Sequence, residues 1–150
     1  MRGYGGFEEF IRSRGGIVAR YELLAAGWTA DELRIAYGNY GRPPRLRRGW
    51  YFSSDVPEVV RRAWKHGGPL ACVSALQWHG VLPSTADSNE PAHSSALHIC
   101  LPRHAHRRRV EANSPLRVIR HWHDACLREG NRWAVPIEVA LEQQRWCTAR

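Results

Sequence analysis

The stretch from Ala25 to Phe52, AAGWTADELRIAYGNYGRPPRLRRGWYF, limits the possible folds more than any other part of the chain. In it, Thr29 stands three positions before Glu32. The Thr29 hydroxyl can accept a hydrogen bond from the backbone amide of Glu32, while the Glu32 carboxylate accepts one from the amide of Thr29. This reciprocal arrangement, a capping box, predicts that a helix begins here. The glycine and prolines of residues 41–44 predict that the helix has ended before them.

The residues before the capping box predict another helix next to this one. In IVARYELLAAGW, four apolar positions recur at helical spacing, and we expect them to face inward: Val18, Tyr21, Leu24 and Ala25. Gly27 provides the turn between the helices, because a sharp turn needs a residue that tolerates positive φ. In the helix that follows, Leu33 and Ala36 should face inward. Two helices joined by a few residues that include glycine are typical of a helix-turn-helix.

An arginine-rich segment, RLRRGWYFSS, follows the helical pair and predicts a tight hairpin or a strand, with Gly49 supplying the turn. Leu46, Trp50 and Phe52 are the side chains available to anchor it. Four arginines would project from this ribbon: Arg42, Arg45, Arg47 and Arg48. A short helix upstream, GGFEEFIRSRGG, ends at its last two glycines. Together these elements predict a winged helix-turn-helix domain at residues 1–54.

Residues 55–150 differ in sequence pattern from residues 1–54 and predict a small body of mixed helices and strands. The whole chain is therefore assigned to the α+β class. SSDVPEVVRRAWKHGG and PLACVSALQWHG read as helices, the first capped by Ser54 or Asp55. ALHICLP and LRVIRHWH alternate as strands do, and VPIEVALEQQRWC predicts a terminal helix. Residues 83–95 carry no apolar period and predict a loop.

Charge points to a polyanionic partner. The formal net charge is +8, and Lys65 is the only lysine among 22 basic residues. A GC-rich genome also replaces lysine with arginine, so the position of the charge is more informative than its amount. In a winged helix-turn-helix the second helix enters the major groove of DNA and the wing meets the backbone. Arg34 is then the candidate for guanine, and Asn39 or Tyr40 could contact a base or a phosphate at the far end of the helix. The arginines of the following segment would contact phosphates.

A second basic run, RHAHRRR, separates the two predicted strands. Its arginines could extend the phosphate footprint or bind an acidic protein, although such a run is often only a solvated loop. The residues concerned are Arg103, Arg107, Arg108 and Arg109.

The sequence offers few of the residue arrangements that catalysis or metal binding requires. Lys65 has no acidic pair beside it, as a metal-dependent nuclease would need. His121, His123 and Cys126 are the residues from which a zinc-dependent hydrolase would be built, but no closed set of four ligands can be assigned. We therefore expect no enzyme, no metal and no cofactor. The four cysteines form no Cys-x-x-Cys, and no leader or membrane-spanning run is visible, which predicts a cytoplasmic protein with reduced thiols.

The stretch GGIVARYELLAAGWTADELRIAYGNYGRPPRLRRGWYF resembles the N-terminal winged helix-turn-helix of AbiEi-type antitoxins, and GPLACVSALQWHGVLP and LHICLPRHAHRRR are similar to the segments behind it. The resemblance implies a transcriptional autoregulator that binds operator DNA and belongs to a toxin-antitoxin system. The DNA contacts that it implies are Thr29, Ala30, Arg34, Asn39, Arg45, Arg47 and Arg48. Longer relatives continue into a very-short-patch-repair-like nuclease domain, whereas this sequence ends at Arg150, so no cleavage is expected.

Two alternatives stay open at this point. The body could neutralise a toxin or another acidic protein through residues 103–109, with the head as a scaffold. The chain could also be a degenerate nuclease-related protein. The oligomeric state is not predicted by the sequence.

Overall fold

The computed structural model describes residues 4–39, 47–83, 96–105, 117–128 and 132–147, and in this part of the chain helices combine with small sheets in an α+β fold. The chain divides into two compact units, Met1–Arg61 and Arg62–Arg150. The predicted boundary, between residues 54 and 55, lies slightly before this division. None of the helices in these ranges is long and apolar enough to cross a lipid bilayer.

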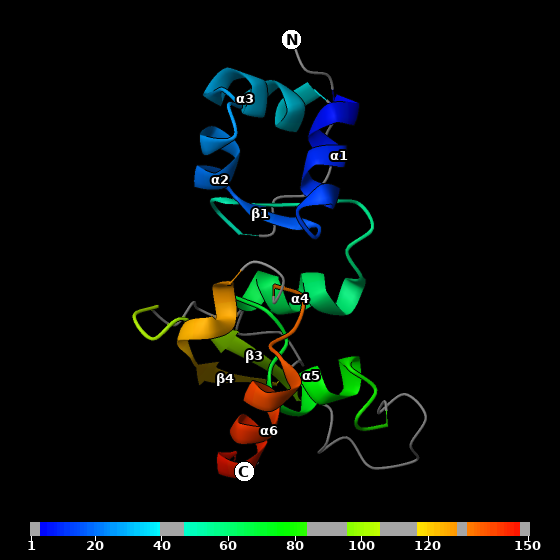
Figure 1. Cartoon of the computed structure of the whole chain (residues 1–150), viewed down its shortest axis with the longest axis vertical. Helices are drawn as coiled ribbons and strands as arrows, with labels where there is room; N and C mark the ends of the chain where they lie inside the picture. The colour runs from blue at the N-terminus through cyan, green and yellow to red at the C-terminus, as the bar shows by residue number, and fades with distance from the viewer. Residues whose placement is uncertain (1–3, 40–46, 84–95, 106–116, 129–131, 148–150) are drawn as a thin grey trace. The chain divides into compact units, whose positions relative to one another are not determined.

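The first unit has the order helix, strand, helix, helix, strand (Figure 1). Its elements are α1 (Tyr4–Ser13), β1 (Ile17–Ala19), α2 (Arg20–Ala25), α3 (Ala30–Asn39) and β2 (Trp50–Phe52). The two strands pair antiparallel, with Ile17 opposite Phe52 and Ala19 opposite Trp50. The helix predicted upstream of the capping box is thus partly a strand, because α2 does not begin until Arg20.

Of the positions predicted to face inward in this segment, Val18 is fully buried as expected, but the three positions within α2 were predicted wrongly. Tyr21 is 68% exposed and Leu24 is 40% exposed, whereas Leu23 is fully buried. The reason lies in the start of α2, where the Glu22 carboxylate accepts a hydrogen bond of 2.9 Å from the backbone amide of Ala19. Val18 therefore belongs to β1 and not to the helix. Counting helical spacing from Val18 selects Leu24 as the inward position, whereas the buried residue is Leu23, one position earlier.

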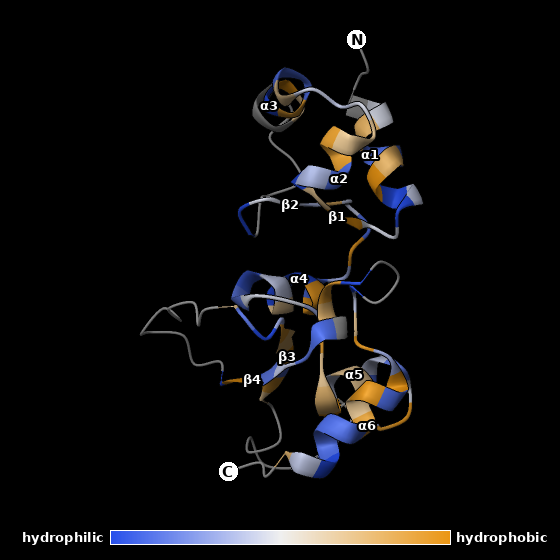
Figure 2. Cartoon of the chain, turned by 60° about the vertical axis from the view of Figure 1, so that its left-hand side comes forward, coloured by the Kyte–Doolittle hydropathy of each residue, from blue (hydrophilic) through white to orange (hydrophobic). Residues whose placement is uncertain are grey.

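An apolar cluster holds the first unit together. Phe7 packs edge-on against Trp28, with ring centroids 5.5 Å apart. The buried members come from every element except β2: Phe7, Ile11, Val18, Leu23, Trp28, Leu33 and Ala36. Figure 2 shows the hydrophobic part of α1 in orange and its hydrophilic C-terminal end in blue. The inward positions predicted for α3, Leu33 and Ala36, are confirmed.

Glu8 of α1 attaches the chain that leaves β2 to this helix. Only 8% of the surface of Glu8 is exposed. Its Oε1 atom accepts hydrogen bonds of 2.6 Å from both the backbone amide and the hydroxyl of Ser54. Helix α4 (Glu58–His66) starts only after Pro57, so neither Ser54 nor Asp55 is its N-terminal cap, contrary to the prediction.

The second unit is built around a two-stranded parallel sheet. Its further elements are α5 (Cys72–Trp78), β3 (Leu97–Leu101), β4 (Val118–Trp122), a 3₁₀ turn η3 (Asp124–Leu127) and α6 (Ile137–Trp146). In the sheet His98 is opposite Ile119 and Cys100 is opposite His121. Helix α5 packs against both α6 and β3 (Figure 1). The two predicted strands and the predicted terminal helix are confirmed.

The segment before α5 runs along the free side of β3. Leu70 forms an antiparallel bridge with Ile99 and a parallel bridge with Ala134. The approach is so close at Gly68 that a Cβ atom there would overlap the carbonyl oxygen of Cys100. Glycine at this position therefore lets the backbone reach β3 and places the first residue of α5 beside the sheet.

Candidate functional site

The start of α3 has the predicted capping box. The backbone amide of Thr29 donates to Glu32 Oε2 at 2.8 Å, and the amide of Glu32 donates to the Thr29 hydroxyl oxygen at 3.1 Å. Because the hydroxyl oxygen uses a lone pair to accept from the helix amide, the O–H group is still able to donate a hydrogen bond. The cap thus fixes the first turn of α3, where its exposed side chains begin.

The two faces of α3 differ sharply in exposure. Leu33 is 2% exposed and Ala36 is 6% exposed, whereas Ala30 and Arg34 lie on the solvent side. The Arg34 side chain is 78% exposed, and its Nη2 atom lies 3.3 Å from Oδ1 of Asp31. Asn39 is the last residue of α3, and its side chain and Tyr40 are outside the part that the structure describes.

The hairpin turn after α3 is formed by residues 47–50. The amide of Trp50 donates to the carbonyl oxygen of Arg47 at 3.2 Å, and the carbonyl oxygen of Gly49 accepts from the amide of Arg20 at 2.8 Å. Gly49 has a φ of +83°, which confirms its predicted place in the turn. Arg48 is exposed and Arg47 is half-buried. Arg42 and Arg45 lie outside the described residues.

Trp50 and Phe52 anchor β2 after this turn, as predicted for the segment, with exposures of 8% and 1%, and β2 pairs with β1. Leu46, the third predicted anchor, is outside the described residues. The buried aromatic positions alternate with half-buried Tyr51, whose ring meets Phe7 edge-on at 5.7 Å. The turn that carries Arg48 is therefore fixed to the same core as α3.

The exposed side of α3 is not uniformly basic. Asp31 and Glu32 occupy its first turn, where carboxylates stabilise a helix through its dipole. These charges oppose attraction to phosphate, but a carboxylate can accept from the amino group of cytosine, and an arginine can donate to guanine. The Asp31–Arg34 pair therefore suits contact with base edges better than contact with the DNA backbone.

The predicted second basic surface is described only at its start. Arg103 Nε lies 3.4 Å from Oδ2 of Asp124, with side-chain exposures of 71% and 62%. Asp124 offsets the charge of Arg103, which lowers its value as a phosphate contact. Arg107, Arg108 and Arg109 lie outside the described residues.

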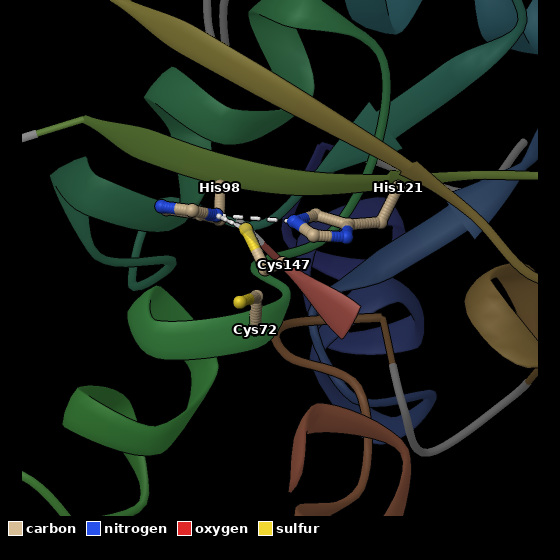
Figure 3. Close-up of side chains that lie close together, drawn as sticks. All are labelled: Cys72, His98, His121 and Cys147. Atoms are coloured by element: carbon tan, nitrogen blue, oxygen red, sulfur yellow. Dashed lines mark hydrogen bonds between the residues drawn. The ribbon is translucent and has the colours of Figure 1, made fainter. Parts of the chain in front are cut away.

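The second unit brings together four side chains that the sequence did not connect. The donor atoms of Cys72, His98, His121 and Cys147 all lie within 4.8 Å of one another (Figure 3). His98 Nδ1 lies 3.0 Å from His121 Nε2 and 3.9 Å from Cys147 Sγ. Cys72 is the first residue of α5, His98 and His121 belong to β3 and β4, and Cys147 follows α6.

Burial sets the protonation of this cluster. It lowers the pKa of His98 to about 4, helped by the nearby charges of His121 and Arg117, and it lowers the pKa of His121 as well. Burial also raises the pKa of the Cys72 thiol to about 12, with a smaller contribution from Cys147. Both imidazoles are therefore neutral at neutral pH, which is the form that binds metals.

The sequence analysis predicted no metal site, and the ligand set that it considered and set aside combined different residues. Of His121, His123 and Cys126, only His121 is in the cluster, while Cys126 is buried in η3. The available signal was the alternation within LHICL and VIRHW, which puts His98 and His121 on one face of adjacent strands. Cys72 and Cys147 carry no comparable signal, because a whole helix or strand separates each donor from the next.

No protein-family model and no curated protein matches this chain.

Proposed function

We propose that the protein is a sequence-specific transcriptional regulator that binds double-stranded DNA through its first unit and represses its own operon. The observation that carries the proposal is the placement of α3. One face of this helix is buried in the apolar cluster and the opposite face presents Ala30 and Arg34, while the turn of residues 47–50 in the same unit carries exposed Arg48. We place this activity in the cytoplasm.

The order of elements supports a docking with α3 in the major groove. In proteins of the winged helix-turn-helix type, residues at the start of the second helix reach base edges. Thr29 and Ala30 are at this end, with the Thr29 hydroxyl able to donate to a phosphate or base oxygen. Arg34 lies one turn further and would donate to O6 and N7 of guanine.

Asp31 gives the proposed contact a specific character. Its carboxylate holds Nη2 of Arg34 at 3.3 Å, which limits the directions in which the guanidinium can point. Near DNA the same carboxylate repels phosphates and accepts only from donors such as the cytosine amino group. We therefore expect α3 to contribute more to sequence discrimination than to total affinity.

The hairpin turn would supply the opposite kind of contact. Arg48 is exposed at the turn, and an arginine on a wing neutralises phosphate charge without reading sequence. Release of condensed counterions then makes binding weaken as salt increases. A specific helix and a non-specific wing are a usual division of roles in this class of DNA-binding domain.

The test is a binding titration of the full chain with the duplex upstream of its own gene and with a scrambled duplex of equal length, at several salt concentrations. We expect a preference of at least about tenfold for the native duplex near physiological salt, which corresponds to about 1.4 kcal/mol. Equal binding to both duplexes that disappears as salt increases would contradict sequence reading.

Two arginine variants separate the roles of helix and wing. Arg34→Ala should weaken binding to the native duplex by about 5- to 150-fold and leave scrambled DNA nearly unaffected. Arg48→Ala should weaken both and reduce the salt slope by about 1. Arg128→Ala, a substitution of an exposed arginine in the second unit, is the matched control for lost charge.

Asp31→Asn tests the proposed restraint on Arg34. Removal of the carboxylate should strengthen binding to the scrambled duplex and so reduce the preference for the native one. An unchanged preference would show that Asp31 does not contribute to base selection.

A further inference from the structure

We propose that Cys72, His98, His121 and Cys147 bind one Zn²⁺ ion as a closed set of four ligands that stabilises the second unit. This proposal does not depend on DNA binding by the first unit, since all four residues lie in Arg62–Arg150.

The donor set fits zinc in kind and number. Structural zinc sites are tetrahedral and use cysteine sulfur and histidine nitrogen, and two of each is one of their common combinations. Thiolate and imidazole together also disfavour magnesium and calcium, which prefer oxygen. With four protein ligands no position is left for water, so the site suits a structural role and not hydrolysis.

The distances between the four donor atoms are already close to those of a tetrahedral zinc site, so the side chains would need to move little. Tetrahedral zinc with ordinary bond lengths needs about 3.3 Å between two nitrogens and about 3.8 Å between two sulfurs. The two histidine nitrogens are 3.0 Å apart, Cys147 Sγ is 3.9 Å from His98 Nδ1, and no pair of donors exceeds 4.8 Å. Shifts of about 1 Å in side-chain position would complete the coordination.

The sheet fixes both histidines on one face. Cys100 is opposite His121 in the parallel register, and His98 lies two residues before Cys100, so both imidazoles project to the same side. Their rings stack with centroids 5.3 Å apart and an interplanar angle of 24°. Figure 3 shows their facing nitrogens directed toward each other, with Cys147 between the histidines and Cys72.

The backbone at Cys72 gives a second, independent reason. Cys72 has a φ of +48°, and within the described ranges it is the only residue other than glycine with a positive φ. A non-glycine residue in this backbone conformation is strained and persists where the surrounding structure holds it, often at ligand sites. A metal–sulfur bond would offset that strain.

Neighbouring side chains support the ligands from outside. Gln143 of α6 accepts a hydrogen bond of 2.9 Å from the backbone amide of Cys72 through Oε1. The hydroxyl oxygen of Ser74 accepts one of 2.9 Å from the backbone amide of His98. Such outer contacts orient metal ligands and are a regular part of zinc sites.

Two other arrangements of the same residues make different predictions. Cys72 and Cys147 could form a disulfide, which would leave the histidines joined only by their hydrogen bond. Without metal or oxidation, both sulfurs would be thiols. Zinc binding instead displaces the thiol protons to solvent and leaves two thiolates on the ion.

The first test is the metal content of the full chain, purified under reducing conditions without a histidine tag or chelator. We expect about one zinc per chain, and loss of it in Cys147→Ser and His121→Asn. The controls are Cys126→Ser, a buried cysteine outside the cluster, and His104→Asn, an exposed histidine, and both should retain zinc. A metal-free wild type that remains folded and binds no added zinc would overturn the proposal.

The second test needs no variant, so it remains decisive if the substituted chains do not fold. Metal-free wild-type protein is titrated with Co²⁺, and the visible spectrum is followed. Tetrahedral cobalt with thiolate charge-transfer bands, saturating at one ion per chain and displaced by zinc, is expected. Octahedral cobalt or no spectral change would overturn the proposal.

Alkylation in the wild type then locates the ligands. Zinc should protect Cys72 and Cys147 from a thiol reagent, and chelation should restore their reaction, as read by peptide mass spectrometry. Equal reaction with and without zinc would contradict the assignment of these ligands. A mass two units low that is restored by reductant would identify the disulfide instead.

Discussion

Both units have buried apolar side chains, but within the described residues only the second unit also brings a set of metal-binding side chains together. The first has a continuous apolar cluster whose members all lie between Phe7 and Ala36, supported by local caps and by Glu8. The second places two histidines and two cysteines together at one face of a two-stranded sheet. The comparison shows that the buried apolar cluster of the first unit comes from one stretch of 30 residues, whereas the four donors of the second unit are spread from Cys72 to Cys147.

Removal of zinc should produce the largest difference between the units. Structural zinc in small domains contributes apparent free energies of about 10–16 kcal/mol at pH 7, so chelation should destabilise the second unit by several kcal/mol. Hydrogen exchange should show lost protection in β3 and β4, with β1 and β2 unchanged. Equal loss in both sheets would mean that the units do not differ in this way.

Phe7→Ala should have the opposite effect and destabilise the first unit while leaving the second unit unchanged. Phe7 is 1% exposed and packs against Trp28, and deletion of a buried aromatic ring costs about 3–5 kcal/mol. We expect the first unit to unfold at a lower urea concentration and DNA binding to fall, while zinc content remains constant. Tyr21→Ala, which removes a ring that is 68% exposed, is the control and should change stability little. Zinc loss in Phe7→Ala would break the proposed independence.

Thr29→Ala has a smaller expected effect, confined to α3. Loss of the hydroxyl that caps Glu32 should destabilise the first unit by about 1 kcal/mol. Thr29→Ser keeps the hydroxyl and should restore both stability and DNA affinity, as measured by urea unfolding and duplex titration. If serine restores stability but not affinity, the methyl group of Thr29 contacts DNA.

The smallest expected effect is the contribution of the Asp55 carboxylate to the stability of the first unit, which acidic pH can test. The hydrogen bond from the Ser53 hydroxyl lowers the pKa of Asp55 below its ordinary value of 3.8, with smaller contributions from the backbone amide of Asp55 and from Arg12. Since the carboxylate form is favoured in the folded state, its contribution is present above the unfolded pKa and disappears as pH falls through the folded pKa.

Asp55→Asn should therefore cost up to about 1 kcal/mol at pH 7, since the carboxylate is largely exposed, and progressively less below pH 3.8. Urea unfolding of the first unit across this range measures the difference. A constant difference at all pH values would assign the effect to packing and not to charge.

The sequence predicted what local geometry determines. The capping box at Thr29, the turn at Gly49 and the inward position of Leu33 each depend on residues a few positions apart. The same local reasoning failed at Tyr21, because the Glu22 bond to Ala19 ends β1 and starts a new helical phase. Arg34 was identified as exposed, but its pairing with Asp31 was not foreseen.

The cluster of Cys72, His98, His121 and Cys147 could not be predicted from residue spacing, because tertiary contacts bring its members together. Alternation alone could align His98 with His121, provided that the two strands were known to be neighbours and parallel. Cys72 joins them only because glycine at 68 lets the chain approach β3, and Cys147 only because α6 packs on α5. Both conditions are tertiary, and neither leaves a mark on residue spacing.

The position of Cys147 as the last donor in sequence has a consequence for biosynthesis. Every residue of the first apolar cluster has been translated once Ala36 is complete, so that unit can begin to fold while the ribosome is still adding residues. The four donors, in contrast, cannot be assembled until Cys147 has emerged from the ribosome. A nascent chain stalled between these two points would present a folded head together with an unfinished body, which is the form most exposed to proteases and chaperones.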